Sequence, residues 1–274
     1  MQTDSHNPDK KAGVIKHTDS WVDGVISRRY EMKYIICESK AEAIKQFIKP
    51  YVQLDRYCKL QRNAVYPIVS LYLDSDNLHL CRESLTGQKN RFKLRIRSYT
   101  DELDYPRFFE IKRRVNNVII KSRSRVMDKD IAALLTGLSM PLHHHYATDH
   151  VALRQFQLYV NSIKAKPVIL IRYMRQAYED DSENRVRVTF DRKLAYNVTA
   201  KPKVTLNGHQ GWQYHLLGSV ILEIKFTDRY PAWLSRMVEC FNLRQQSMSK
   251  YATSIQEACS MGLCVRRLGE SDSG

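Results

Sequence analysis

Arg91-Phe92-Lys93-Leu94-Arg95-Ile96-Arg97 alternates cationic and apolar side chains along its whole length. In a β-strand, alternate side chains lie on opposite faces, so this stretch predicts a strand with one basic face and one apolar face. In a helix, the same cations would be scattered around the axis. Four cations on one strand face repel one another unless an anion lies beside them. The stretch therefore predicts either an ordinary solvated sheet face or a face that binds an anion.

The same alternation of charged and apolar side chains returns in other candidate strands. Several strands with one apolar and one charged face are typical of a closed or strongly curved sheet whose apolar outside is covered by helices. We therefore predict an α+β fold, an antiparallel β-barrel tunnel with a charged lumen and flanking helices. The candidate strands span residues 29–35, 109–115, 118–123, 168–172, 185–190 and 220–226.

Composition bounds both the domain count and the kind of partner. The chain has 274 residues, a net charge of +15 and a pI near 9.5. This basic balance indicates an anionic partner: nucleic acid, a membrane surface, or a phosphorylated small molecule or polymer. No linker rich in Pro, Gly or Ser interrupts the middle of the chain. We predict one domain over residues 25–258, a disordered tail at 1–24 and a flexible tail at 259–274.

Apolar runs and cysteines bear on the cellular location. No apolar run is long enough to span a bilayer, and the first residues lack the apolar core of a signal peptide. The six cysteines show no CxxC spacing, which favours reduced thiols over a disulfide or zinc framework. We therefore predict a cytoplasmic protein without a transmembrane segment. The sequence gives no indication of an oligomeric state.

Helix signals separate the candidate strands. Ser39 and Glu42 form a capping box, in which each side chain can satisfy a backbone N–H at the start of a helix. Pro231 is suited to open a later amphipathic helix. The helix that opens at the capping box is predicted to run to about residue 49, and the remaining predicted helices span about residues 128–137, 149–163 and 246–258.

Three features of the sequence suggest metal ligands, and each has a simpler explanation. His143-His144-His145 are consecutive, so they cannot all point at one ion from a regular element. The acidic turn at 179–184 lacks the alternating ligands and central Gly of a calcium loop. Glu223 beside Lys225 is either a metal ligand or a salt-bridge partner, and the pattern alone favours the salt bridge.

A set of short motifs, in this order along the chain, resembles the VTC domain, the polyphosphate polymerase domain of the vacuolar transporter chaperone complex. The resemblance covers about residues 27–256 and places the chain beside the triphosphate tunnel metalloenzymes, with their CYTH-type relatives. Each motif is weak alone, whereas the ordered set is fairly specific. The motifs are Tyr30-Glu31-Met32-Lys33-Tyr34, Leu71-Tyr72-Leu73-Asp74, Arg95-Ile96-Arg97, Glu110-Ile111-Lys112-Arg113, Lys121-Ser122-Arg123, Ile171-Arg172-Tyr173, Leu222-Glu223-Ile224-Lys225 and Ser249-Lys250-Tyr251.

The resemblance implies a role for particular side chains in the tunnel. Glu223 would hold a divalent metal, Mn²⁺ or Mg²⁺, with Glu31 as a second carboxylate. The implied catalytic cations are Lys33, Arg95, Arg97, Lys112, Arg172 and Lys250. Further contacts to phosphate are expected from Lys93, Lys121, Arg123, Arg187 and Lys225.

The function that the resemblance implies is a metal-dependent transfer of the γ-phosphate of ATP to a growing inorganic polyphosphate chain. Phosphoryl transfer needs positioned cations and a metal, and little else from the protein. The expected partners are ATP and polyphosphate. No SPX-like helical module precedes the matched region and no membrane segment follows it, so inositol-phosphate regulation and membrane translocation are not expected.

Two alternatives remain open at the level of the sequence. One is a triphosphatase or another hydrolase with the same tunnel. The other is a non-catalytic protein that binds polyphosphate or nucleic acid. A nucleic-acid binder is expected to carry its cations on an outer surface with exposed aromatic residues. Here the cations lie in strands whose opposite faces are apolar, so we expect no nucleic acid partner.

Overall fold

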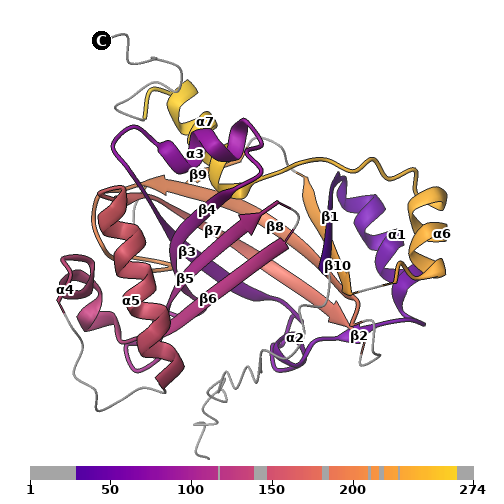
Figure 1. Cartoon of the computed structure of the whole chain (residues 1–274). Helices are drawn as coiled ribbons and strands as arrows, with labels where there is room; N and C mark the ends of the chain where they lie inside the picture. Colours follow the sequence, from indigo (N-terminus) through magenta and orange to yellow (C-terminus); the bar gives the residue numbers. More distant parts are fainter. Residues whose placement is uncertain are drawn as a thin grey trace, which may run out of the picture.

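The computed structural model describes residues 29–116, 118–138, 147–180, 185–208, 211–215, 219–227 and 229–263. Its strands join in one sheet with helices around it (Figure 1). The strands are β1 (Arg29–Ile36), β2 (Gln53–Leu54), β3 (Tyr66–Asp74), β4 (Arg91–Ser98), β5 (Arg107–Val115), β6 (Val118–Val126), β7 (Lys166–Glu179), β8 (Arg187–Val198), β9 (Gln213–Tyr214) and β10 (Val220–Thr227). The helices are α1 (Glu38–Ile48), α2 (Arg56–Lys59), α3 (His79–Leu85), the 3-10 helix η1 (Asp128–Asp130), α4 (Ile131–Leu135), α5 (Ala147–Ser162), α6 (Ala232–Cys240) and α7 (Lys250–Ser260).

The sheet is antiparallel and strongly curled. Its order is β1-β10-β8-β7-β3-β4-β5-β6. The Lys112 ammonium of β5 lies 3.1 Å from the Glu31 carboxylate of β1, although β10, β8, β7, β3 and β4 separate these strands in the sheet. Among the described residues, the edge strands β1 and β6 do not pair with each other. The predicted α+β fold is therefore confirmed in the form of a curled half-barrel, with a side-chain ion pair across its opening.

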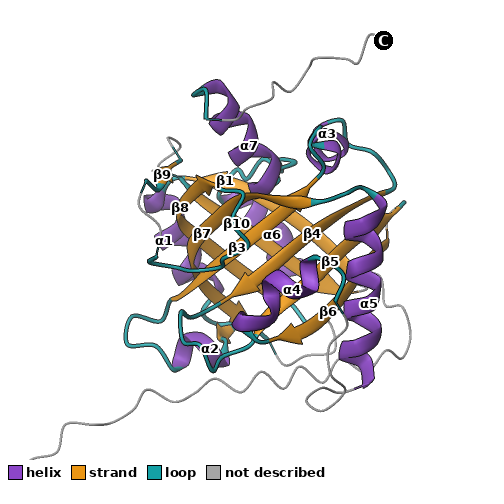
Figure 2. Cartoon of the chain, turned by 90° about the vertical axis from the view of Figure 1, so that its left-hand side faces the viewer, coloured by secondary structure: helices purple, strands orange, loops and turns teal. Residues whose placement is uncertain are grey.

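Helix α5 covers the outer face of β4, β5 and β6 (Figure 2). Leu94 and Ile96, which alternate with the cations of β4, are fully buried there. The rings of Phe109 and Phe156 meet edge to face beside them, with centroids 4.8 Å apart. Burying a Leu or Ile side chain stabilises the fold by about 1.5–3 kcal/mol. The apolar face of β4 thus holds the strand in place against the repulsion on its basic face.

Helices α1 and α6 cover the outer face of β1, β10 and β8. Ile44 of α1 and Leu234 of α6 are fully buried, in one cluster with Ile224 of β10. The predicted cap at Ser39 does not form, because α1 begins one residue earlier and its N-cap residue is Cys37. The two groups of helices lie outside the curl, so its inner face is left to the charged side chains and to the apolar contacts of α7 with β3 and β7.

Helix α7 packs at one end of the curl, on the inner side. It begins at Lys250, four residues later than predicted. The Ser249 hydroxyl caps it by accepting a hydrogen bond from the Ala252 amide at 3.2 Å. The preceding segment is extended, because the Gln246 amide donates to the carbonyl of Lys33 at 2.9 Å. The first turn of α7 is thereby brought to the inner face of the sheet.

A buried hydrogen bond and a ring stack attach α7 to β3. The Tyr251 hydroxyl donates to the carboxylate of Asp74 at 2.6 Å, and its ring stacks on Tyr72 at a centroid distance of 4.8 Å. Burial raises the pKa of Asp74, against the effect of its hydrogen bonds from Tyr251 and from the α3 amides. Asp74 therefore joins α3 and α7 to the end of one strand.

Several predictions fall outside the described residues. These are the tail at 1–24, the three consecutive histidines, most of the acidic turn after β7, and the chain beyond Leu263. Helix α7 continues to Ser260, two residues into the predicted tail at 259–274. Within the described part of the chain, no helix has the length and apolar character needed to cross a bilayer.

Candidate functional site

The basic face of β4 lies on the inside of the curl, beside matching faces of β5 and β6. Residues directly opposite in an antiparallel pair have Cβ atoms about 4.5–5.5 Å apart, so their charges interact. The strand register aligns two sets of three side chains across these strands. We call Lys93, Lys112 and Lys121 the lysine row, and Arg95, Glu110 and Arg123 the arginine row.

The arginine row is compensated by its own carboxylate. Glu110 is buried and accepts from Arg95 Nε at 2.6 Å and from Arg123 Nε at 2.8 Å. Arg97, one step along β4, lies 3.8 Å from Glu110 and donates to the Ser70 hydroxyl at 3.2 Å. Burial raises the pKa of Glu110, but these three guanidinium groups outweigh it and hold the pKa well below its ordinary value. The carboxylate therefore stays ionised and fixes three arginines.

The lysine row contains no carboxylate. Burial lowers the pKa of Lys93 well below its ordinary value, and the neighbouring Lys112 adds to this. Burial lowers the pKa of Lys112 to about 8, although Glu31 opposes the shift. The Lys121 side chain is accessible to water, but the walls of the curl surround it and partly desolvate its ammonium group. This desolvation, with the charges of Lys225 and Lys112, lowers the pKa of Lys121 to about 7. No ion pair of Lys93 or Lys121 is found within the described residues, so the row repels itself until an anion binds.

Two carboxylates face the lysine row from β1 and β10. Glu31 lies 2.9 Å from Lys33 and 3.1 Å from Lys112, and Glu223 contacts Lys225. Burial and the charge of Glu223 act to raise the pKa of Glu31. The ammonium groups of Lys112, Lys33 and Lys225 outweigh them and hold this pKa well below its ordinary value. Burial also raises the pKa of Glu223, and Lys225 and Lys33 more than offset this. Both carboxylates are therefore ionised at neutral pH.

The first turn of α7 brings a cation and a hydroxyl to the inner face. The Lys250 ammonium lies 2.7 Å from the buried carboxylate of Asp191 on β8. Arg175 of β7 binds the same carboxylate through two nitrogens, at 2.7 and 2.8 Å. Lys93 donates to the Ser249 hydroxyl at 2.6 Å. The start of α7 is thus tied to both sides of the curl.

Arg187 lies on the inner face at the opposite end of β8. Its guanidinium lies 2.6 Å from the buried carboxylate of Asp55 and 2.5 Å from Glu179. Two carboxylates and the Tyr66 hydroxyl at 3.4 Å occupy its donors. Of the predicted phosphate ligands, Arg187 is therefore already compensated within the protein.

Arg172 is placed differently from the prediction. It lies on the outer face of β7, where its guanidinium stacks over Trp212 at 4.2 Å and donates to the Leu206 carbonyl and the Tyr214 hydroxyl. The reason is strand alternation, because Arg172 shares a face with the core residue Leu170. It is therefore not a ligand on the inner face. The other predicted residues lie on the inner face or in the first turn of α7: Glu31, Lys33, Lys93, Arg95, Arg97, Lys112, Lys121, Arg123, Arg187, Glu223, Lys225 and Lys250.

Arg175 is the inner-face arginine of β7, and it was not predicted from the sequence. The predicted strand ended at Arg172, whereas β7 continues to Glu179. Ile169, Ile171, Tyr173 and Arg175 alternate onto one face, and Arg175 is opposite Asp191 in the register. A longer strand at this position would have pointed to Arg175 instead.

Oxygen atoms of β1, β8 and β10 on the inner face could bind a divalent metal. Glu31 and Glu223 supply carboxylate oxygens, and Thr189, directly opposite Glu223, has a buried hydroxyl with no hydrogen-bond partner among the described residues. No three His, Cys, Asp or Glu side chains in the described part of the chain converge on one point. Mg²⁺ and Mn²⁺ are often held by one or two carboxylates together with substrate phosphates. These oxygens fit such a metal, shared with a phosphate.

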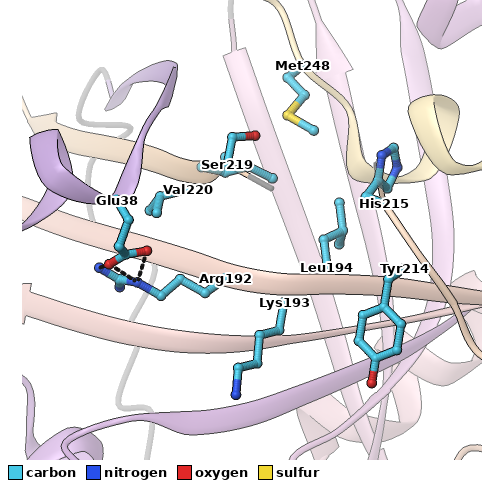
Figure 3. A pocket seen from close by; sticks show the side chains of 10 residues that line it. Glu38, Arg192, Lys193, Leu194, Tyr214, His215, Ser219, Val220 and Met248 are labelled. Carbon is cyan, nitrogen blue, oxygen red and sulfur yellow. Dashed lines mark hydrogen bonds and ion pairs between the residues drawn. The ribbon is translucent and has the colours of Figure 1, made fainter. Parts of the chain in front are cut away.

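A separate pocket of about 300 Å³ lies at the end of β8 and β10 (Figure 3). Its walls include Leu194, Tyr214, His215 and Met248. Arg192 at its edge is bound by Glu38 through two nitrogens, at 2.7 and 2.9 Å. None of the predicted site residues lines this pocket, so the cationic inner face and the pocket are different places.

The family model described as the VTC domain matches residues 28–259, so the chain belongs to the VTC domain family. This confirms the family resemblance. No curated protein matches the chain.

Solved structures also match the chain, at low sequence identity. A Bacillus halodurans protein described as an adenylate cyclase is 14% identical, with a TM-score of 0.43, over 82% of this chain and 94% of that chain. The PH1819 protein from Pyrococcus horikoshii is 10% identical, with a TM-score of 0.42, over 84% and 99%.

Proposed function

We propose that the chain is a metal-dependent polyphosphate polymerase, which transfers the γ-phosphate of ATP to a growing inorganic polyphosphate chain on the inner face of the curl. The observation that carries the proposal is the lysine row. Lys112 of this row pairs with Glu31, whereas Lys93 and Lys121 have no ion pair among the described residues, so three like charges in register favour a further anion beside them. The adjacent arginine row extends the same surface with rigid guanidinium groups, which suit phosphate oxygens.

The charge balance of the inner face supports an anion longer than one triphosphate. ATP carries about four negative charges, and a divalent metal cancels two of them. Carboxylates neutralise some of the inner-face cations, so the excess of positive charge on this face is smaller than the sequence alone indicates. Cations still outnumber carboxylates: Lys33, Lys93, Arg95, Arg97, Lys112, Lys121, Arg123, Arg175, Arg187, Lys225 and Lys250 face Glu31, Asp55, Glu110, Glu179, Asp191 and Glu223.

In this proposal, Glu223 and Glu31 hold Mn²⁺ or Mg²⁺, with the Thr189 hydroxyl nearby. The bound metal would neutralise charge on the triphosphate oxygens. The lysine row binds the γ-phosphate of ATP and the end of the polyphosphate. A terminal oxygen of the polyphosphate can then approach the γ-phosphorus in line. A new P–O–P bond forms as the bond between the β- and γ-phosphates breaks, and ADP leaves.

Hydrolysis of a triphosphate is the second candidate, favoured by the internal carboxylates. Glu110, Asp191 and Asp55 already pair with six cations, which leaves a smaller surface for a long anion. A non-catalytic polyanion-binding protein would use the same rows without turnover. A cytoplasmic location is part of the proposal.

Incubation of the purified chain with ATP and Mn²⁺ or Mg²⁺, followed by gel electrophoresis of the products, tests the proposal. The expected result is a ladder of phosphate chains with release of ADP. Orthophosphate without a ladder would identify a hydrolase. Tight binding of polyphosphate without turnover of ATP under either metal would identify a binding protein.

A further inference from the structure

The inner-face cations of β4 and β5 continue beyond the lysine row to the end of the sheet. In the register of these strands, Arg91 is directly opposite Arg114. Each is two residues from a member of the lysine row, Lys93 or Lys112, and so lies on the same face. Two residues along a strand correspond to about 7 Å. The pair is therefore the next step of the same surface, at the rim.

Backbone carbonyls hold both guanidinium groups at this rim. Arg91 donates to the carbonyl of Gln88, and Arg114 Nε donates to the carbonyl of Asn116 at 2.8 Å. Neither arginine forms an ion pair among the described residues. Burial and the charge of Arg114 lower the pKa of Arg91, while Glu83 opposes the shift in part. The pair thus consists of two like charges, partly open to solvent, that no carboxylate neutralises directly.

We infer that Arg91 and Arg114 form a phosphate-binding subsite for linear polyphosphate at the rim of the curl. The inference rests on the proposed function and extends it. It assigns to this rim the binding of the phosphate units of the polyphosphate that lie outside the reaction centre. Carbonyl contacts fix one side of each guanidinium, and its remaining N–H groups can bind phosphate oxygens bidentately.

The position of the rim makes the subsite selective for chain length. An anion that contacts both the arginine row and the rim must extend roughly 14 Å along the strands. A short anion centred on the arginine and lysine rows satisfies their cations without reaching Arg91 and Arg114. A long chain reaches all three steps. The rim should therefore add affinity for long-chain polyphosphate and little for tripolyphosphate.

Binding titrations with tripolyphosphate and with long-chain polyphosphate test this inference. The variants are Arg91→Gln/Arg114→Gln and, as a matched control, Arg154→Gln, which removes an exposed arginine of α5. In the double variant, the Kd for the long chain should rise about tenfold or more, as expected for the loss of two exposed charged contacts. The Kd for tripolyphosphate should change by less than about twofold. The control should match wild type with both anions.

Two results would overturn the subsite. One is an unchanged affinity of the double variant for the long chain. The other is an equal loss for both anions, which would mean a general effect of charge. Arg91→Lys/Arg114→Lys, which keeps the charge, should recover part of the long-chain affinity, and tripolyphosphate binding shows that each variant is folded. If wild type binds neither anion, the proposed function fails and the subsite fails with it.

Discussion

At the scale of single residues, Lys121 links charge repulsion to ligand binding. Its pKa is lowered to about 7, whereas an unfolded lysine titrates near 10.4. Between these values the unfolded chain binds more protons, so the contribution of this group to stability rises with pH. Without an anion, Lys121→Gln should therefore raise the Tm at pH 7, and the gain should shrink toward pH 10. Calorimetric scans across this range measure it.

The same titration should affect ligand binding. Tripolyphosphate needs the charged form of Lys121, so the affinity of wild type should fall as the pH rises from 7 to 9. Lys121→Arg stays charged throughout and should lack that part of the decline. Because the ionisation of the anion is common to both proteins, the difference between them isolates the lysine. Parallel pH profiles for wild type and Lys121→Arg would contradict the assigned pKa.

Glu223 allows a test of the proposed metal position. Glu223→Gln should abolish turnover that depends on a divalent metal, because a neutral amide is a poor ligand for Mg²⁺ or Mn²⁺. Anion binding without metal should be equal or stronger, since one negative charge leaves the inner face. Turnover assays over a range of metal concentrations, with Glu179→Gln as the control at the far end of the curl, make the measurement. A variant that is less stable but keeps its metal response would leave Glu223 as the salt-bridge partner of Lys225 only.

At the scale of strands, the arginine row behaves as a unit held by Glu110. Glu110→Gln leaves the buried Arg97 and the partly buried Arg95 and Arg123 without their carboxylate, and breaking such a network costs about 3–5 kcal/mol. Unfolding titrations should show this loss. Added tripolyphosphate should then raise the Tm of the variant more than that of wild type, because it replaces the missing negative charge. An equal or smaller rise in the variant would mean that the anion does not contact this row.

At the scale of helices, Tyr251 attaches α7 to the sheet through Asp74. Tyr251→Phe keeps the stack on Tyr72 and removes one hydrogen bond to a buried carboxylate. The free energy of unfolding should fall by about 1.5–3 kcal/mol. Chemical denaturation measures it, with Tyr214→Phe as a control at an exposed tyrosine. A stability equal to that of wild type would show that the apolar contacts of α7 suffice to hold it.

Strand alternation explains which site residues could be predicted from the sequence. In β4 every second residue is a cation, so the pattern assigns Lys93 and Arg95 to one face without knowledge of the fold. In β7 the inner face is apolar up to Tyr173, and its single arginine follows two residues later. The family motif ended near Arg172, and only the full length of β7 distinguishes Arg172 from Arg175.

At the scale of the whole molecule, the alternation predicted a curled sheet with a charged inside, and it could not predict how the charges pair. Pairing depends on contacts between strands that are distant in sequence, such as Glu31 of β1 with Lys112 of β5, or Asp55 with Arg187. The open edge between β1 and β6 was also beyond the sequence, because strand number and curl are set by the packing of α5, α1 and α6. The net charge of +15 indicated an anionic partner. Among the described residues, the inner-face cations without an ion pair are therefore Lys93 and Lys121 of the lysine row and the rim arginines Arg91 and Arg114.

We expect a linear phosphate anion to bind to the lysine row, and calorimetric titration of tripolyphosphate measures this binding. Lys93→Gln/Lys121→Gln removes two cations that have no ion pair among the described residues, so the fold should be spared. The affinity should fall by about 100-fold or more, because each charge-assisted contact contributes about 1.5–3 kcal/mol. Arg172→Gln, on the outer face, should stay within about threefold of wild type. An unchanged affinity in the lysine variant, or an equal loss in the Arg172 variant, would contradict the account.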